Sequence, residues 1–248
     1  MQAARIPDPD AAELDFSMLS HDDLVNIVLQ RSEVLSDVRQ PAAVIRNWEA
    51  GDPARLDSVV QDKGRVLAER AANVIREEFE ALMPVLDAIR PKSIADIGCG
   101  YAFFDLYAYR RYASRLLLVD VEENERRHFG FDEEAAAYTS LEIAHKFLTA
   151  NGVPTESVST WNPEIEDPGE TEKVDLAVSF LSCGFHFPVD MYMPFFRFGV
   201  VPGGSIILDL RGQAFQENRR TLMSLGKVEV LSKGGGRRRV LVRKGRAR

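Results

Sequence analysis

The stretch from Ile94 to Ala102 most constrains what this chain can fold into, because it joins an apolar run to two closely spaced glycines. It reads Ile-Ala-Asp-Ile-Gly-Cys-Gly-Tyr-Ala, and a second apolar run at 116–119 ends at Asp120. This pattern predicts a buried strand, a glycine turn into a helix, and a second strand with an acid at its tip. Glycines let a ligand approach the backbone, and such an acid can accept hydrogen bonds from two ribose hydroxyls. The stretch therefore predicts a nucleoside site.

The spacing of the glycines argues against a dinucleotide as the ligand. A dinucleotide turn has the pattern G-x-G-x-x-G, and bulky Phe103 stands where its last glycine should be. Asp96, two residues before Gly98, would repel a pyrophosphate, whereas it suits an ammonium or a sulfonium group. The turn thus favours a ligand with a cationic group near Asp96.

With these residues the chain resembles the class I methyltransferases that depend on S-adenosylmethionine (SAM). Their first motif is acid-x-Gly-x-Gly-x-Gly, which Asp96, Gly98 and Gly100 match, while Ala102 replaces the third glycine. A proline-glycine-glycine turn at 202–204 is a further motif of that family. The resemblance covers residues 90–245 and implies SAM as the cofactor and methyl transfer as the reaction.

Strands and helices are predicted to alternate along the core. Apolar runs predict five parallel strands, at 94–97, 116–119, 158–162, 174–180 and 205–210. Helical patterns lie at 103–112, 134–150 and 191–198. Residues 227–231 and 239–243, joined by three glycines, predict a closing antiparallel hairpin. The expected fold is α/β, a doubly wound, mostly parallel sheet of seven strands with an antiparallel terminal hairpin.

A helical extension at 1–88 is expected to precede the SAM-binding core at 89–248. Residues 1–16 are rich in proline and acids, which predicts poor order. Helical patterns then follow Ser20 and Pro53, and the second is predicted to end or kink at Pro84. In the family that the chain resembles, such extensions commonly cover the cofactor and shape the acceptor pocket. A stabilising wrap without substrate contact is the alternative, and the sequence leaves both open.

The resemblance implies cofactor contacts at the carboxyl ends of the strands, where open parallel sheets bind ligands. The backbone of Gly98, Cys99 and Gly100 would lie against the methionine moiety, with Asp96 near its amino group. Asp120 would bind the ribose hydroxyls. Cys99 itself is interpreted as a small residue tolerated in a tight turn rather than as a reactive thiol.

The resemblance also implies contacts from residues near the ends of later strands. Val121 would pack on the adenine, and Asn162 would pair with the adenine edge. Trp161 would stack on the adenine or belong to the core, and both interpretations stay open. Ser179 would lie beside the methionine end of the cofactor.

His186 is the candidate catalytic residue, because it is the histidine that lies just beyond a strand tip. An oxygen acceptor of high pKa needs a proton acceptor in reach, and His186 could be that base. The alternative is a structural hydrogen bond within the aromatic run Gly-Phe-His-Phe-Pro at 184–188. That run is similar to Gly-Phe-His-Tyr-Pro of bacterial proteins described as sugar O-methyltransferases, with Phe187 in place of the tyrosine. It points to a hydroxyl of a sugar or another metabolite as the acceptor.

Composition limits the classes of partner. The net charge of −7 disfavours a nucleic-acid partner and favours a small-molecule acceptor. Basic residues cluster at 233–239 and 243–248; a solvated hairpin turn and a frayed terminus are preferred there to a phosphate or membrane-surface site. The two cysteines offer neither a disulfide framework nor zinc spacing, so no metal is expected.

The sequence also predicts a cellular location and leaves two alternative functions open. No apolar stretch is long enough for a membrane span and the start lacks the apolar core of a signal peptide, which favours a cytoplasmic protein. Association into a homo-oligomer is left open. Two rival functions remain: an aminopropyltransferase-like enzyme, and a non-catalytic SAM-binding regulatory or partner protein.

Overall fold

The computed structural model describes residues 11–121, 140–166 and 171–246, and its centre is a sheet of seven strands. The strands lie in the order β3-β2-β1-β4-β5-β7-β6. Their bounds are β1 (Ser93–Ile97), β2 (Arg115–Val119), β3 (Val158–Trp161), β4 (Val174–Ser179), β5 (Val200–Arg211), β6 (Gly226–Gly234) and β7 (Arg237–Lys244). Strands β1 to β5 pair in parallel, whereas β7 pairs antiparallel with both β5 and β6. The predicted sheet and terminal hairpin are confirmed.

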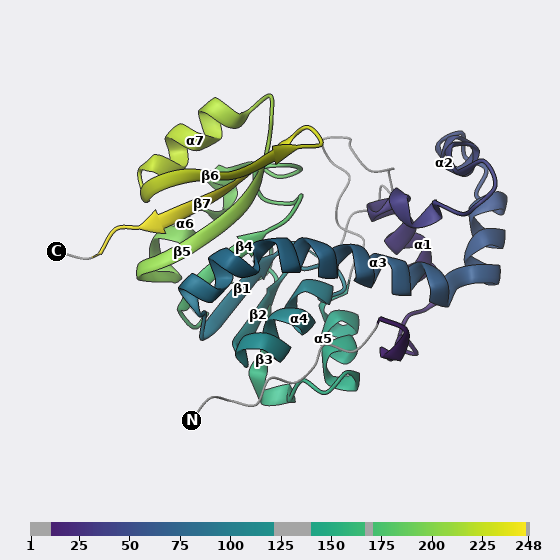
Figure 1. Ribbon diagram of the computed structural model, residues 1–248, viewed down its shortest axis with the longest axis horizontal. Helices are drawn as coiled ribbons and strands as arrows, with labels where there is room; N and C mark the ends of the chain where they lie inside the picture. The colour runs from purple at the N-terminus through teal and green to yellow at the C-terminus, as the bar shows by residue number, and fades with distance from the viewer. Residues whose placement is uncertain (1–10, 122–139, 167–170, 247–248) are drawn as a thin grey trace.

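Helices cover both faces of the sheet, as the alternation of buried residues along each strand requires (Figure 1). On β2, Leu116 and Leu118 belong to one hydrophobic cluster, and Leu117 and Val119 belong to the other. The first cluster contains α4 (Phe103–Tyr112) and α5 (Leu141–Ala150), and the second contains α6 (Val189–Phe198) and α7 (Phe215–Met223). Helix α4 has the predicted bounds, α6 begins two residues early, and α7 was not predicted. Of the predicted helix at 134–150, residues 134–139 lie outside the described residues.

The N-terminal segment is helical, and its long helix passes the predicted stop. Its elements are η1 (Ala11–Glu13), α1 (His21–Gln30), η2 (Ser32–Leu35), α2 (Pro41–Glu49) and α3 (Ala54–Ile89). Helix α3 continues through Pro84 to Ile89, so of the two predicted outcomes the end at Pro84 is wrong, and the kink stays a prediction. Proline removes one backbone hydrogen bond, but buried Leu82 and Leu86 hold the last turns against the core. None of the described helices is both long and apolar enough to cross a membrane.

Residues 11–16 also differ from the expectation of poor order, because they pack onto the core. The ring of Phe16 stacks on that of Phe147 at a centroid distance of 5.8 Å and meets Phe103 edge-on at 6.1 Å. Leu14 is buried as well. The proline and acid content of this segment predicted poor order because it does not reveal the packing of Leu14 and Phe16. Residues 1–10 lie outside the described part of the chain.

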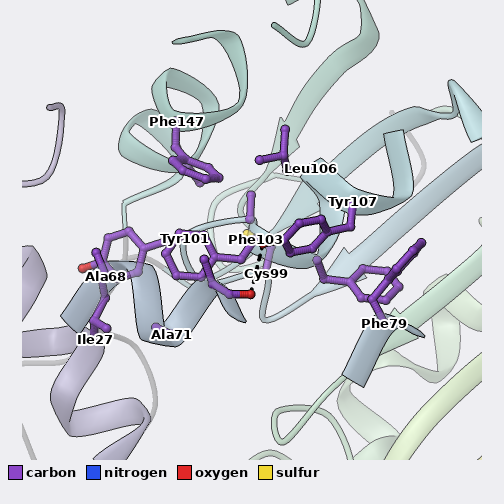
Figure 2. Packing of buried hydrophobic residues seen from close by; sticks show 14 of the residues in the cluster. Ile27, Ala68, Ala71, Phe79, Cys99, Tyr101, Phe103, Leu106, Tyr107 and Phe147 are labelled. Atoms are coloured by element: carbon purple, nitrogen blue, oxygen red, sulfur yellow. Dashed lines mark hydrogen bonds between the residues drawn. The ribbon is translucent and has the colours of Figure 1, made fainter. Parts of the chain in front are cut away.

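The N-terminal helices and the α/β core share one hydrophobic cluster (Figure 2). Phe79 of α3 contacts the rings of Phe104 and Tyr107 of α4, at 5.5 and 6.1 Å between centroids. The Tyr107 hydroxyl donates a hydrogen bond to the Ala72 carbonyl at 3.1 Å. Helix α3 is therefore anchored along α4, which starts at the glycine turn.

A candidate nucleoside and acceptor site

The glycine turn after β1 is tied to the end of β2 by backbone hydrogen bonds. The N–H groups of Gly98 and Cys99 both donate to the Val119 carbonyl, at 2.7 and 3.3 Å. The Gly100 N–H donates to Oδ2 of Asp120 at 3.2 Å. Because β1 and β2 are neighbouring parallel strands, their carboxyl ends meet, and this brings the turn and the acid of the sequence motif together.

Gly98 is the position of the turn that tolerates a side chain least. Its φ is +75°, and a Cβ atom built there would lie 2.3 Å from Cβ of Ser182 in the loop after β4. We therefore expect Gly98→Ala to lower the free energy of unfolding by roughly 2–4 kcal/mol, from left-handed backbone strain plus the clash. Urea unfolding measures this loss.

Gly51 provides a matched control for that substitution. Its φ is +83°, and nothing lies within 4 Å of a Cβ atom built on it. Gly51→Ala should carry only the backbone strain, about 1 kcal/mol. Equal losses at Gly51 and Gly98 would show that Ser182 does not confine the turn.

A cavity of about 430 Å³ opens beside the glycine turn. Five residues predicted to bind the cofactor line it together, and so does the candidate base: Asp96, Gly98, Cys99, Gly100, Asp120 and His186. This volume lies within the range of pockets for small molecules. The structure thus gathers residues from β1, β2 and the loop after β4 around one space.

Four other predicted residues do not line this cavity. The indole of Trp161 packs against the ring of Phe195 of α6, with 5.2 Å between the centroids, and donates to the Glu166 carbonyl at 3.2 Å, so it belongs to the core. Oδ1 of Asn162 accepts from the Glu164 N–H at 3.0 Å, and Val121 is buried. For Trp161 the core alternative describes its place in the structure.

Ser179 is the fourth of these residues, and its hydroxyl is committed to the protein. It donates to the Ile97 carbonyl at 2.7 Å and accepts from the Cys183 N–H at 2.9 Å. The side chain is fully buried. Ser179 therefore ties the tip of β4 to β1 and to the following loop, and its place beside the methionine end of the cofactor stays a prediction.

The thiol of Cys99 is buried in an acidic environment. Burial raises its pKa well above the ordinary value, and the charges of Asp120, Asp105 and Asp96 raise it further. The thiol therefore stays protonated at neutral pH. This agrees with its interpretation as a small residue in the turn rather than a nucleophile.

Residues of the N-terminal helices also line the cavity, which sequence reasoning did not assign to the site. Glu78 of α3 accepts from Nη1 of Arg31, at the end of α1, and from Nη2 of Arg237 on β7, each at 3.1 Å. All three residues line the cavity. A signal was present in the sequence: Ile75, Glu78 and Leu82 lie on one helical face, so Glu78 puts a carboxylate into an apolar stripe.

The basic run at 233–239 is only partly the solvated turn that was expected. Arg239 is buried and binds Asp209 of β5 through two hydrogen bonds of 2.7 Å. Its guanidinium lies 4.6 Å from the ring centre of Phe180, which lines the cavity. Arg237 and Arg239 of β7 are thus held by two acids, Glu78 and Asp209, that are distant in the sequence.

Three contacts fix the loops around the cavity. The Tyr101 hydroxyl, at the end of the glycine turn, donates to Asp23 of α1 at 3.0 Å. The His186 backbone N–H donates to the Ser182 carbonyl at 2.9 Å, and its ring meets Phe185 edge-on at 5.1 Å. Both the turn and the candidate base are therefore held by the elements that surround the cavity.

Comparisons with solved structures establish the fold. The SAM-dependent methyltransferase SibL superposes with a TM-score of 0.51 at 15% sequence identity, over 90% of this chain and 74% of SibL. A Nostoc punctiforme PCC 73102 protein, provisionally described as an O-methyltransferase, gives 0.50 at 12% identity. That match covers 73% of this chain and 58% of the Nostoc chain, less than two thirds of its length. No protein-family model and no curated protein matches the sequence. The molecule has the fold of class I SAM-dependent methyltransferases.

Proposed function

We propose that this protein is an enzyme that transfers a methyl group from SAM to a small molecule, at a hydroxyl of a sugar or another metabolite. The observation that carries the proposal is the meeting of the glycine turn, Asp96 and Asp120 at one cavity, beside a histidine. The fold supports it, because class I methyltransferases share this sheet.

The residues at the turn fit the charge and shape of SAM. Asp96 offers a carboxylate to an ammonium group, and Asp120 offers oxygens to ribose hydroxyls. Gly98 and Gly100, both with positive φ, leave the backbone open to close approach. Bound SAM would supply a methyl group on a sulfonium, which is an already activated carbon electrophile.

The remaining tasks of the chain are to align the acceptor and to keep water out. Residues of α1, α3 and the hairpin β6–β7 line the cavity, among them Arg31, Glu78 and Arg237. Their ion pairs join segments from both ends of the chain over one space. We infer that the N-terminal extension covers the cofactor and shapes the acceptor pocket.

His186 is proposed as the base that takes the proton of the acceptor hydroxyl. We expect His186→Ala to reduce turnover by roughly 100-fold to 10,000-fold, the usual contribution of general base catalysis, and to leave SAM affinity unchanged. Steady-state kinetics and calorimetric titration with SAM measure the two quantities.

His21 of α1 is the control for this substitution, because its ring pairs with Asp57 of α3 at 3.2 Å and it does not line the cavity. His21→Ala should leave turnover unaltered. If His186 only holds the aromatic run at 184–188, His186→Ala will lower stability while the rate on the true acceptor stays the same.

The charges that line the cavity bear on the choice between methyl transfer and aminopropyl transfer. Among the described residues, the charged side chains that line the cavity beyond Asp96 and Asp120 are three basic and two acidic ones: Arg31, Lys233, Arg237, Glu33 and Glu78. A polyamine acceptor would need an acidic pocket, and this part of the wall is not acidic in balance. The charges therefore favour methyl transfer.

Screening of sugar, phenol and amine acceptors for production of S-adenosylhomocysteine tests the proposed reaction. We expect turnover with hydroxyl acceptors. Tight SAM binding without turnover of any acceptor class would instead support the non-catalytic regulatory protein, and turnover of amines alone would contradict hydroxyl methylation.

A further inference from the structure

A second buried carboxyl group lies behind Asp96. Asp105, in the first turn of α4, is fully buried, and it is not part of the cavity wall that includes Asp96. Among the described residues, neither of its oxygens accepts a hydrogen bond from a hydroxyl or from the N–H of another residue. An ionised carboxylate in such a place costs several kcal/mol unless something compensates it.

Asp105 and Asp96 are neighbours in this buried place. Their side chains lie within hydrogen-bonding reach, which two carboxyl groups achieve only when one of them is protonated. Burial raises the pKa of both groups, and the negative charges of Asp105 and Asp120 raise that of Asp96 further. The pair titrates as a unit rather than as two independent acids.

No described cation offsets this pair. The titratable groups that face it are Cys99 from the glycine turn and Asp120 from the end of β2. The packed face of α3 brings Phe79 and the Ala72 carbonyl to α4, and neither carries a charge. Within the described ranges, no three His, Cys, Asp or Glu side chains are arranged to hold a metal ion. A cation brought by a ligand would suit the pair.

We propose that Asp96 and Asp105 form an acid pair that holds one proton in the ligand-free protein and releases it to solvent when the ammonium group of SAM binds. The inference rests on the proposed function. The balance is simple: a carboxyl O–H bond breaks, its proton goes to water, and the ammonium, already protonated, takes its place beside two carboxylates. Asp105 acts through Asp96 and is a positioning residue.

The pair predicts how stability of the ligand-free protein depends on pH. A carboxyl group whose folded pKa is raised binds more protons folded than unfolded, so stability falls as pH rises from about 4, the unfolded value, through the raised value of about 7 for Asp105. Asp105→Asn removes the buried charge. The midpoint of thermal unfolding of this variant near pH 8 should therefore be about 2–4 °C higher than that of the wild type. Its stability should also fall less between about pH 4 and pH 7.

Binding of SAM gives the second readout. Calorimetric titrations near pH 6.5, in buffers with different ionisation enthalpies, report the number of protons exchanged. The full-length wild type should release about one proton per SAM bound, and Asp105→Asn should release almost none and bind more weakly. A residue with a merely structural role would not gain stability while it loses affinity and proton release.

Asp190 provides the matched control, since it lies in the first turn of α6, a helix of the same length, and is exposed. Asp190→Asn should leave the proton count and the pH dependence of stability unchanged. SAM binding without proton release by the wild type, or equal release by Asp105→Asn, overturns the inference. Failure of the wild type to bind SAM contradicts the proposed function instead. In that case the pH dependence of thermal stability, measured without ligand for the wild type and Asp105→Asn, still decides whether the pair holds a proton.

Discussion

Asp120→Asn is expected to weaken SAM binding by roughly 100-fold, because the substitution removes the charge from two hydrogen bonds to the ribose. The carboxylate lies at the tip of β2, where Oδ2 already accepts from the Gly100 N–H at 3.2 Å. Asparagine keeps an oxygen for that N–H, so the turn should survive. Calorimetric titration with SAM measures the affinity, and urea unfolding checks that the variant folds.

Asp175 is the control for Asp120, because it lies at the other end of the parallel strands. At the start of β4 it accepts from the backbone N–H groups of Lys92 and Ser93, each at 3.0 Å. Asp175→Asn should lower stability and leave SAM affinity unaltered. Wild-type affinity in Asp120→Asn would remove Asp120 from the ribose site.

Glu78→Ala should have the largest effect on stability, a loss of roughly 3–5 kcal/mol in the free energy of unfolding. Glu78 lies between Arg31 and Arg237, and its second oxygen is 3.6 Å from Nη2 of buried Arg239. Removal of this carboxylate leaves half-buried guanidinium groups without their shared partner. Glu33→Ala is the matched control: Glu33 also pairs with Arg31, but it is 49% exposed, so it should cost less than about 1 kcal/mol.

The acid stability of the protein should change with the same substitution. Burial alone would raise the pKa of Glu78, but the charges of Arg31, Arg237 and Arg239 lower it to about 2. A lowered pKa contributes stability above the unfolded value and loses it as pH falls through the folded value. The wild type should therefore lose this contribution between about pH 4.5 and pH 2, and Glu78→Ala should not. If the free energies of unfolding of the two proteins fall in parallel as the pH is lowered, the ion pairs of Glu78 add nothing to acid stability.

The core fold followed from local patterns in the sequence. Continuous apolar runs mark parallel strands that are covered on both faces, and β2 and β4 lie within one residue of their predicted bounds. The glycine turn and the acid at 120 were found together because parallel neighbours bring their ends to one edge. These signals depend on residues close in the sequence, which is why they could be read without a structure.

The walls of the site depend on contacts between distant segments, and the sequence did not predict them. Arg31, Glu78 and Arg237 meet only after α3 packs along α4 and the hairpin folds back. Asp105 was not singled out in the sequence, and only the fold brings it beside Asp96. Ser179 ended a strand as expected, but its hydroxyl satisfies backbone groups that the sequence does not reveal.

Calorimetric titration of this 248-residue chain with SAM, and separately with NAD, decides whether the site binds SAM. The glycine turn, Asp96 and Asp120 predict saturable binding of SAM at one site per chain and no binding of NAD. Binding of NAD, with no binding of SAM at millimolar concentration, would contradict the account.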